Sequence, residues 1–258
     1  MRAILLDFGG TLDADGTTWI DRFYSLYKDE GLRPSREEFE DAFYASDDNL
    51  AKRFPLAGVG LEQTLDLQVR CVLEVLAPDA VPAAKPAPPE ERRGRPRREP
   101  PEEPQDEAAG GLPDGLDGLG GRVAARFLAD CRRHFRRNRP VLERLRRNYK
   151  LGIVSNFYGN LDSVLDGEGL LDLFDAISDS GVVGAEKPDG KLFLHAARSL
   201  GVEAAECLMV GDSVRRDMRG AEGLGMPHAL IATDPALACC PSCWVLPDVT
   251  HLERRLAA

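Results

Sequence analysis

The chain has 258 residues, of which 43% are hydrophobic, and it carries a formal net charge of −10 at pH 7. This length suits one domain with a sizeable insertion, or two modest domains. The acidic balance argues against a nucleic-acid partner, and it leaves any anionic ligand to be held by a metal and a few local cations. No apolar stretch approaches the roughly twenty residues of a membrane helix, and no secretion signal opens the chain. We therefore expect no membrane contact and a cytoplasmic location with reduced thiols.

The first predicted element is a short apolar strand, residues 3–6, which ends at Asp7 in a Gly-Gly turn. Helical patterns follow it. Apolar residues recur at helical spacing in 18–31 and in 60–77, and a capping box formed by Ser35 and Glu38 opens another helix between them.

Composition changes sharply over residues 82–121, which are rich in Pro, Gly, Ala, Glu and Arg and poor in large apolar side chains. Such a segment cannot bury enough surface to offset its ordering, so we expect a disordered insertion. Its arginine cluster at 92–98 stands among acidic residues, which favours a solvated segment over a polyanion-binding one. A helix resumes near Ala124, and its arginines are expected to face solvent rather than to clamp a substrate.

From Pro140 onward, predicted strands at 151–154, 176–178, 207–210 and 229–231 alternate with helical patterns. Strands that alternate with helices predict a parallel sheet covered on both faces. The expected fold class is α/β, with a Rossmann-like core made of residues 1–16 and 140–258 and an inserted helical cap at 17–139.

Four short motifs with polar residues are expected to meet at the carboxyl edge of this sheet, where ligands bind in open α/β sheets. They are Asp7, the pair Ser155-Asn156, Lys187 in Glu186-Lys187-Pro188-Asp189, and Asp212 with Asp217. Two buried strands that each end in Asp can bring oxygen ligands together for a hard cation such as Mg²⁺. In this order and spacing, the four motifs resemble the haloacid dehalogenase-like (HAD) hydrolase superfamily, and the helical insertion resembles its C1-type cap.

The resemblance implies a phosphatase that acts on a small phosphorylated metabolite. Asp7 would be the nucleophile that forms an aspartyl-phosphate. Mg²⁺ would lie on Asp7, the Gly9 carbonyl and Asp212, with Asp217 orienting Lys187 or a metal-bound water. The remaining implied roles are charge neutralisation by Lys187 and phosphate or scaffold hydrogen bonds from Ser155, Asn156 and Thr11.

One position departs from the phosphatase pattern, because Gly9 stands where a second Asp usually serves as general acid and base. Acid–base catalysis is worth about 10²–10⁴-fold in rate. Either Asp13, Asp15 or a cap residue supplies the proton, or the substrate has a good leaving group, or the protein binds phosphate with little turnover. The hypothesis is a metal-dependent phosphatase biased toward leaving groups of low pKa.

Two other functions stay open. A 2-haloacid dehalogenase also lacks the second Asp, but it attacks carbon without metal and does not need the acidic pair at 212 and 217. A catalytically weak HAD fold could instead serve as a phosphate-binding or regulatory module. The oligomeric state is not predicted.

The cysteines raise a separate question, since three of them cluster in Cys239-Cys240-Pro241-Ser242-Cys243. A structural zinc site would need a fourth ligand, with His228 and His251 as candidates. A loop with partly buried thiols is the preferred expectation. Cys71, Cys131 and Cys207 are expected in the core, and His195 is expected to pack in a helix.

Overall fold

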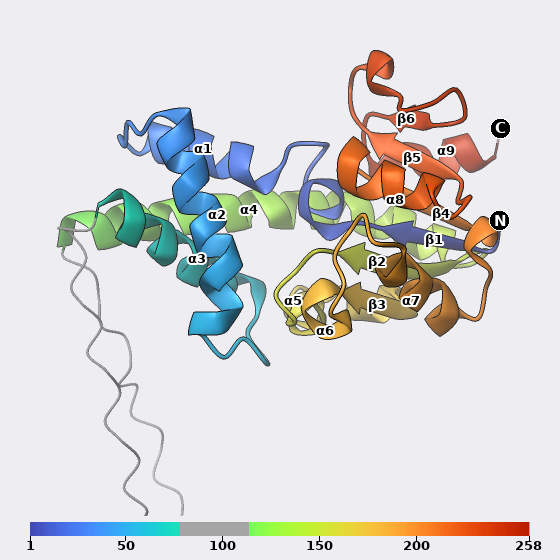
Figure 1. The fold of residues 1–258 in the computed structure, drawn as a ribbon, viewed down its shortest axis with the longest axis horizontal. Coiled ribbons are helices and arrows are strands. Elements are labelled where there is room, and N and C mark those ends of the chain that lie inside the picture. The colour runs from blue at the N-terminus through green and yellow to red at the C-terminus, as the bar shows by residue number, and fades with distance from the viewer. Residues whose placement is uncertain (78–113, 258) are drawn as a thin grey trace, which may run out of the picture.

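In the computed structural model, which describes residues 1–77 and 114–257, six parallel strands form one sheet with helices on both faces (Figure 1). The order across the sheet is β3-β2-β1-β4-β5-β6. The strands are β1 (Ala3–Leu6), β2 (Lys150–Ser155), β3 (Ala176–Asp179), β4 (Cys207–Gly211), β5 (His228–Ile231) and β6 (Trp244–Leu246). The predicted α/β class with a parallel sheet is confirmed.

The central strand β1 is apolar throughout because both of its faces are covered by other elements. Successive side chains of a strand point to opposite faces of the sheet. Ala3 and Leu5 pack against the helix α7 (Gly190–Leu200), whereas Ile4 and Leu6 pack in the larger core on the other face. Since both faces are covered, all four side chains are fully buried, as is typical of a strand in a parallel sheet.

In the described residues between β1 and β2, four α-helices form the helical insertion, which lies to one side of the sheet in Figure 1. The capping box of Ser35 and Glu38 is present at the start of the second one. The insertion consists of α1 (Trp19–Asp29), α2 (Arg36–Arg53), α3 (Leu61–Leu76) and α4 (Asp114–Leu145). The shorter helices α5 (Leu161–Gly167), α6 (Ser180–Val183), α8 (Arg219–Glu222) and α9 (Leu252–Leu256) belong to the sheet domain.

The long helix α4 extends beyond both boundaries expected from the sequence. It begins at Asp114, so the last part of the expected disordered insertion is helical, while residues 82–113 lie outside the described residues. Leu119 and Val123 are buried in the core, and Gly120 allows close approach to α3, because a Cβ there would lie 3.1 Å from Leu73 Cδ1. At the other end α4 continues through Pro140 to Leu145, so one helix runs from the insertion to the sheet domain.

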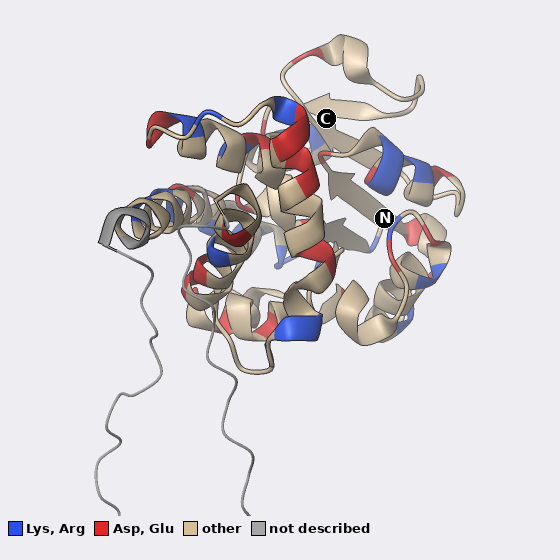
Figure 2. Ribbon diagram, turned by 60° about the vertical axis from the view of Figure 1, so that its left-hand side comes forward, with Lys and Arg blue, Asp and Glu red and all other residues tan. Residues whose placement is uncertain are grey.

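Charged residues of both signs are interspersed along the described helices in the view of Figure 2. None of the described helices is long and apolar enough to cross a membrane.

Candidate active site

The carboxyl ends of three neighbouring strands place the central residues of the site. Asp7 follows β1, Ser155 ends β2 and Asp212 follows β4. The backbone N–H of Asp7 donates to the Val210 carbonyl at 2.9 Å, which continues the β1–β4 ladder to the site. Lys187 enters from the loop that precedes α7. The four motifs identified in the sequence therefore meet at one edge of the sheet.

Asp7 is held through a single carboxylate oxygen. Its Oδ1 accepts hydrogen bonds from Phe8 N and from Ser155 Oγ, each at 2.7 Å, and lies 2.7 Å from Lys187 Nζ. No described residue donates a hydrogen bond to Oδ2. The side chain is nearly buried but borders a cavity. One oxygen thus fixes the carboxylate, and the other keeps its lone pairs available for a ligand or an electrophile.

Lys187 links the two acidic motifs. Its Nζ also lies 2.7 Å from Asp217 Oδ1, and Asp217 is fully buried. Burial alone lowers the pKa of Lys187, but the charges of Asp217 and Asp7 outweigh it, so the pKa is raised and the ammonium stays charged. The Asn156 side chain accepts from Lys187 N at 2.7 Å and donates to Lys187 O at 3.4 Å. Asn156 therefore positions the lysine backbone.

The three carboxylates of Asp7, Asp212 and Asp217 fit a hard cation. One carboxylate oxygen of each lies within 4.8 Å of the others. Burial, followed by the charges of Asp7 and Asp217, raises the pKa of Asp212 well above its usual range, and burial raises the pKa of Asp217 to about 6. One ammonium leaves this group short of positive charge, and oxygen-rich acidic groups are the preferred ligands of Mg²⁺.

Thr11 lies beneath this cluster and away from the cavity. It is fully buried, and its Oγ1 donates to Asp212 Oδ1 at 3.1 Å. Of the two roles expected for it, phosphate donor or scaffold, this geometry fits the scaffold, because the hydroxyl is used in orienting Asp212.

Gly9 faces a tryptophan at the position where the acid/base residue would project. A Cβ on Gly9 would lie 3.1 Å from Trp19 Nε1 and 3.2 Å from Trp19 Cδ1. The indole N–H of Trp19 donates to Asp13 Oδ2 at 2.7 Å, which fixes the ring in this place. The side-chain space beside Gly9 is therefore filled by the first helix of the insertion.

Neither nearby acid named in the sequence analysis is free to replace that residue. Asp13 is fully buried and accepts from Gly10 N at 2.7 Å and from Arg22 Nη1 at 2.8 Å. Asp15 is bound by Arg137, whose Nη1 donates to Asp15 Oδ2 at 2.7 Å. Both carboxylates are neutralised by arginines and are absent from the residues that line the active-site cavity.

The cavity above Asp7 has a volume of about 220 Å³ and is walled by both the sheet domain and the insertion. Asp47 and Arg216, which were not predicted from the sequence, also line this wall. Asp47 comes three residues after Tyr44 and four after Phe43, so a carboxylate on the apolar side of α2 was the available signal. The aromatic residues that line the cavity are Trp19, Phe43, Tyr44, Phe157 and Tyr158.

Asp47 has the environment of a proton donor. It is partly buried, accepts a hydrogen bond from the Tyr158 hydroxyl and has a raised pKa, caused mainly by burial and opposed by Tyr158 and Arg216. A carboxyl group whose pKa is raised retains its proton to higher pH than usual.

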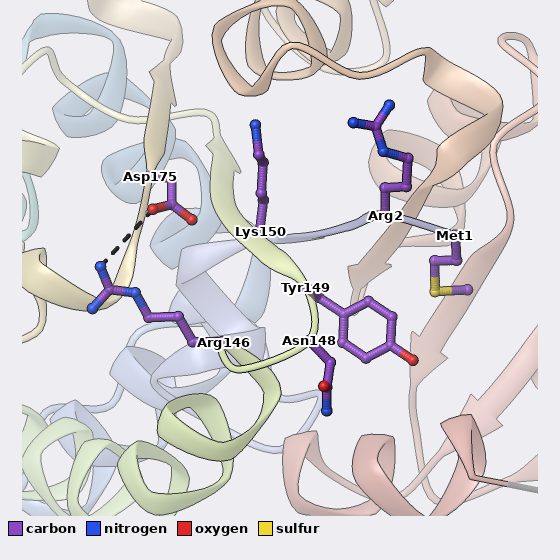
Figure 3. Close-up of a pocket in the computed structure, with 7 residues that line it drawn as sticks. All are labelled: Met1, Arg2, Arg146, Asn148, Tyr149, Lys150 and Asp175. Carbon is purple, nitrogen blue, oxygen red and sulfur yellow. Dashed lines mark ion pairs between the residues drawn. The ribbon is translucent and has the colours of Figure 1, made fainter.

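A second hollow, of about 430 Å³, lies at the opposite edge of the sheet, where β1 and β2 begin (Figure 3). Its cations already have partners. Arg2 pairs with Glu206, Arg146 pairs with Asp175, and Lys150 donates to the Leu200 carbonyl. The carboxyl edge of the sheet therefore remains the candidate site, in agreement with the general position of ligands in α/β sheets.

Fold and site together define an α/β protein with an acidic cluster at the carboxyl edge of a parallel sheet, beneath a helical insertion. Residues 1–225 match the family model described as haloacid dehalogenase-like hydrolase. The chain belongs to this family, as the resemblance in its sequence implied.

Curated relatives match part of the chain. Haloacid dehalogenase-like hydrolase domain-containing protein 3 of Bos taurus is 38% identical over 112 residues, which are 42% of this chain and 45% of the relative. Phosphoserine phosphatase of Thermus thermophilus is 35% identical over 129 residues, or 46% of this chain and 48% of the relative. The chain thus spans about half the length of the curated relatives it matches.

A solved dehalogenase with an intermediate complex shares the fold, with a TM-score of 0.58 and 18% identity over all of this chain and 98% of the other. Its likeness supports the architecture of the sheet and its helical insertion.

Proposed function

We propose that the protein is a Mg²⁺-dependent phosphatase that transfers a phosphoryl group to Asp7 and then to water. The observation that carries this proposal is the arrangement of Asp7: three donors fix Oδ1, no described residue donates to Oδ2, and the side chain borders a cavity beside two further carboxylates and a buried lysine. Phosphatases among the curated relatives support the same chemistry.

In the proposed reaction, Asp7 Oδ2 attacks phosphorus and the leaving oxygen departs, so that an aspartyl-phosphate forms. Ser155 and Lys187 lie beside the attacking carboxylate, where they can donate to phosphoryl oxygens as charge develops. Asp217 keeps Lys187 charged and in place. Asp7, Asp212 and the Gly9 carbonyl would hold Mg²⁺, with Asp217 behind them; the ion would supply the positive charge that two approaching anions require.

Asp47 is the proposed source of the proton that Gly9 cannot give. Its carboxyl group lines the same cavity as Asp7 and comes from the helical insertion.

The mixed aromatic and polar wall of this cavity fits a small phosphorylated metabolite with an apolar portion. No disulfide joins any of the six cysteines, all of which the structure describes, and we infer a reducing compartment such as the cytoplasm.

The proposal is tested by hydrolysis of an aryl phosphate and of 2-chloropropionate by the purified chain, with and without Mg²⁺. Phosphate release that requires Mg²⁺ supports the phosphatase. Metal-independent chloride release would identify a dehalogenase instead. No turnover of either compound, with Mg²⁺ still bound, would favour the phosphate-binding module.

Asp47→Asn should slow hydrolysis of an alkyl phosphate by about 10²–10⁴-fold and that of an aryl phosphate much less, because an aryl leaving group needs little protonation. Since burial raises the pKa of Asp47, the protonated acid is lost as pH rises through that pKa. The wild-type rate on alkyl phosphates should therefore fall with rising pH, and this decline should disappear in the variant. Asp48→Asn, at the next and exposed position, is the control; equal effects on both substrates would remove Asp47 from the acid role.

Mg²⁺ should raise the melting temperature of the wild-type chain and should do so far less in Asp212→Asn. At a free concentration about ten times Kd, binding stabilises the fold by about 1.4 kcal/mol, or about 3–6 °C in Tm. Differential scanning fluorimetry measures the shift, with the exposed Asp166→Asn as the control. A full shift in Asp212→Asn would place the ion elsewhere.

A further inference from the structure

The connection from β5 to β6 lacks the usual means of stabilising a parallel crossover. Parallel neighbours are usually joined by a segment that contains an α-helix, which packs on the sheet. Here residues 232–243 make the connection, and their only regular structure is the 3₁₀ turn Pro235–Leu237, of which no residue is buried. The three clustered cysteines lie in the returning half of this connection.

One histidine meets two of these thiols. His228 Nε2 lies 3.4 Å from Cys239 Sγ and 3.5 Å from Cys240 Sγ. The other ring nitrogen, Nδ1, lies 2.9 Å from the Met226 carbonyl, which accepts a hydrogen bond only from a protonated nitrogen. That contact assigns the proton to Nδ1 and leaves the Nε2 lone pair facing the sulfurs.

The separations suit a tetrahedral ion. Zinc bonds of about 2.3 Å to sulfur and 2.0–2.1 Å to nitrogen, at tetrahedral angles, place the two ligand atoms about 3.5 Å apart. The three ligand atoms of His228, Cys239 and Cys240 all lie within 4.8 Å of one another. The ring orientation and the two nitrogen–sulfur distances therefore match what zinc requires.

Cys243 can complete the set. It is three residues after Cys240, a common spacing of zinc-binding cysteines. Cys243 is buried and packs in the same small cluster as Cys239 and Cys240, against Met218. The other histidine considered from the sequence, His251, instead pairs with Asp248 at 3.0 Å.

We propose that His228, Cys239, Cys240 and Cys243 bind a structural Zn²⁺ ion that fastens the β5–β6 connection to the first residue of β5. Three thiolates and an imidazole form a closed, soft ligand set of the kind found in structural zinc sites. His228 begins its strand, whereas Asp7 and Asp212 follow the carboxyl ends of theirs. The ion would therefore stabilise the edge of the sheet without entering the reaction.

The first test is metal content. The full chain, purified under reducing conditions with zinc in the medium and passed through a desalting column, should retain about one zinc per chain by mass spectrometry. Asp212→Asn should retain it too, Cys240→Ser should lose it, and Cys71→Ala is the control for loss of a thiol outside the cluster. Absence of zinc from the wild type, or its loss in Asp212→Asn alone, would overturn the proposal.

A second measurement uses only the wild type, in case Cys240→Ser fails to fold. Cys239 and Cys240 are partly exposed, so a thiol reagent should modify them readily in chelator-treated protein and slowly in zinc-loaded protein. Equal reactivity in both would contradict the site. A Cys240–Cys243 disulfide that persists under the reducing conditions, with no zinc bound, would assign the cluster to redox chemistry instead.

Discussion

Asp7→Asn is expected to reduce hydrolysis of an aryl phosphate by more than about 10⁴-fold, as removal of a nucleophile does in covalent catalysis. The amide is nearly the same size as the carboxylate and can still accept the hydrogen bonds of Ser155 and Phe8 through its oxygen. The site should therefore keep its shape while it loses the anion that attacks phosphorus. Acid-quench mass spectrometry should detect a phosphorylated wild-type chain during turnover and none in the variant.

The control for Asp7 is Asp15→Asn. Asp15 belongs to the same loop but is paired with Arg137 and does not line the cavity. Its variant should keep most of the activity. If Asp7→Asn retained a tenth of the wild-type rate, or if the phosphoryl group were found on another residue, Asp7 would not be the nucleophile.

Lys187→Met should lower kcat by about 10²–10³-fold, the effect of removing one donor to developing negative charge. It should also destabilise the fold. Removal of one partner of a buried ion pair costs about 3–5 kcal/mol because the other charges are left uncompensated, and Lys187 lies between two carboxylates. Kinetics and urea unfolding measure the two effects on the same protein.

The matched control is Lys191→Met, since Lys191 lies four residues further on and its side chain is 80% exposed. It should change neither quantity appreciably. The pKa of Lys187 is raised above its ordinary value, so its stabilising charge persists throughout the neutral range and is lost only at strongly alkaline pH. Asp217, whose pKa is about 6, is ionised above that pH as well, so a stability difference that vanished between pH 7 and 8 would be inconsistent with the ion pair.

The sequence predicted the residues of the site more fully than their contacts. A buried strand places the residue after it at the carboxyl edge of the sheet, and this rule alone brought together Asp7, Ser155 and Asp212. Lys187 and Asp217 depended on the family resemblance, because neither ends a strand. The hydrogen-bond acceptor of Thr11 could not be predicted from the sequence pattern. A hydroxyl group turns toward whichever acceptor the fold brings within reach, and here that acceptor is Asp212.

Contacts between the insertion and the sheet domain were beyond prediction for the same reason. Asp47 and Trp19 join the cavity only because α1 and α2 pack over it, and no local pattern specifies that packing. The start of α4 at Asp114 depends on burial of Leu119 and Val123 against α3, which outweighs the low helix propensity of nearby glycines. His228 likewise meets Cys239 only through the return of the chain to the sheet.

The contact between Gly9 and Trp19 makes these two positions interdependent. Aspartate at position 9, with Trp19 unchanged, would require the indole to shift by a few tenths of an ångström, because a Cβ on Gly9 would lie 3.1 Å from Trp19 Nε1. That shift would strain the hydrogen bond of 2.7 Å that the indole donates to the buried Asp13. Loss of Trp19 alone would remove this hydrogen bond and leave the space beside Gly9 open. A substitution at either position is therefore best made together with one at the other.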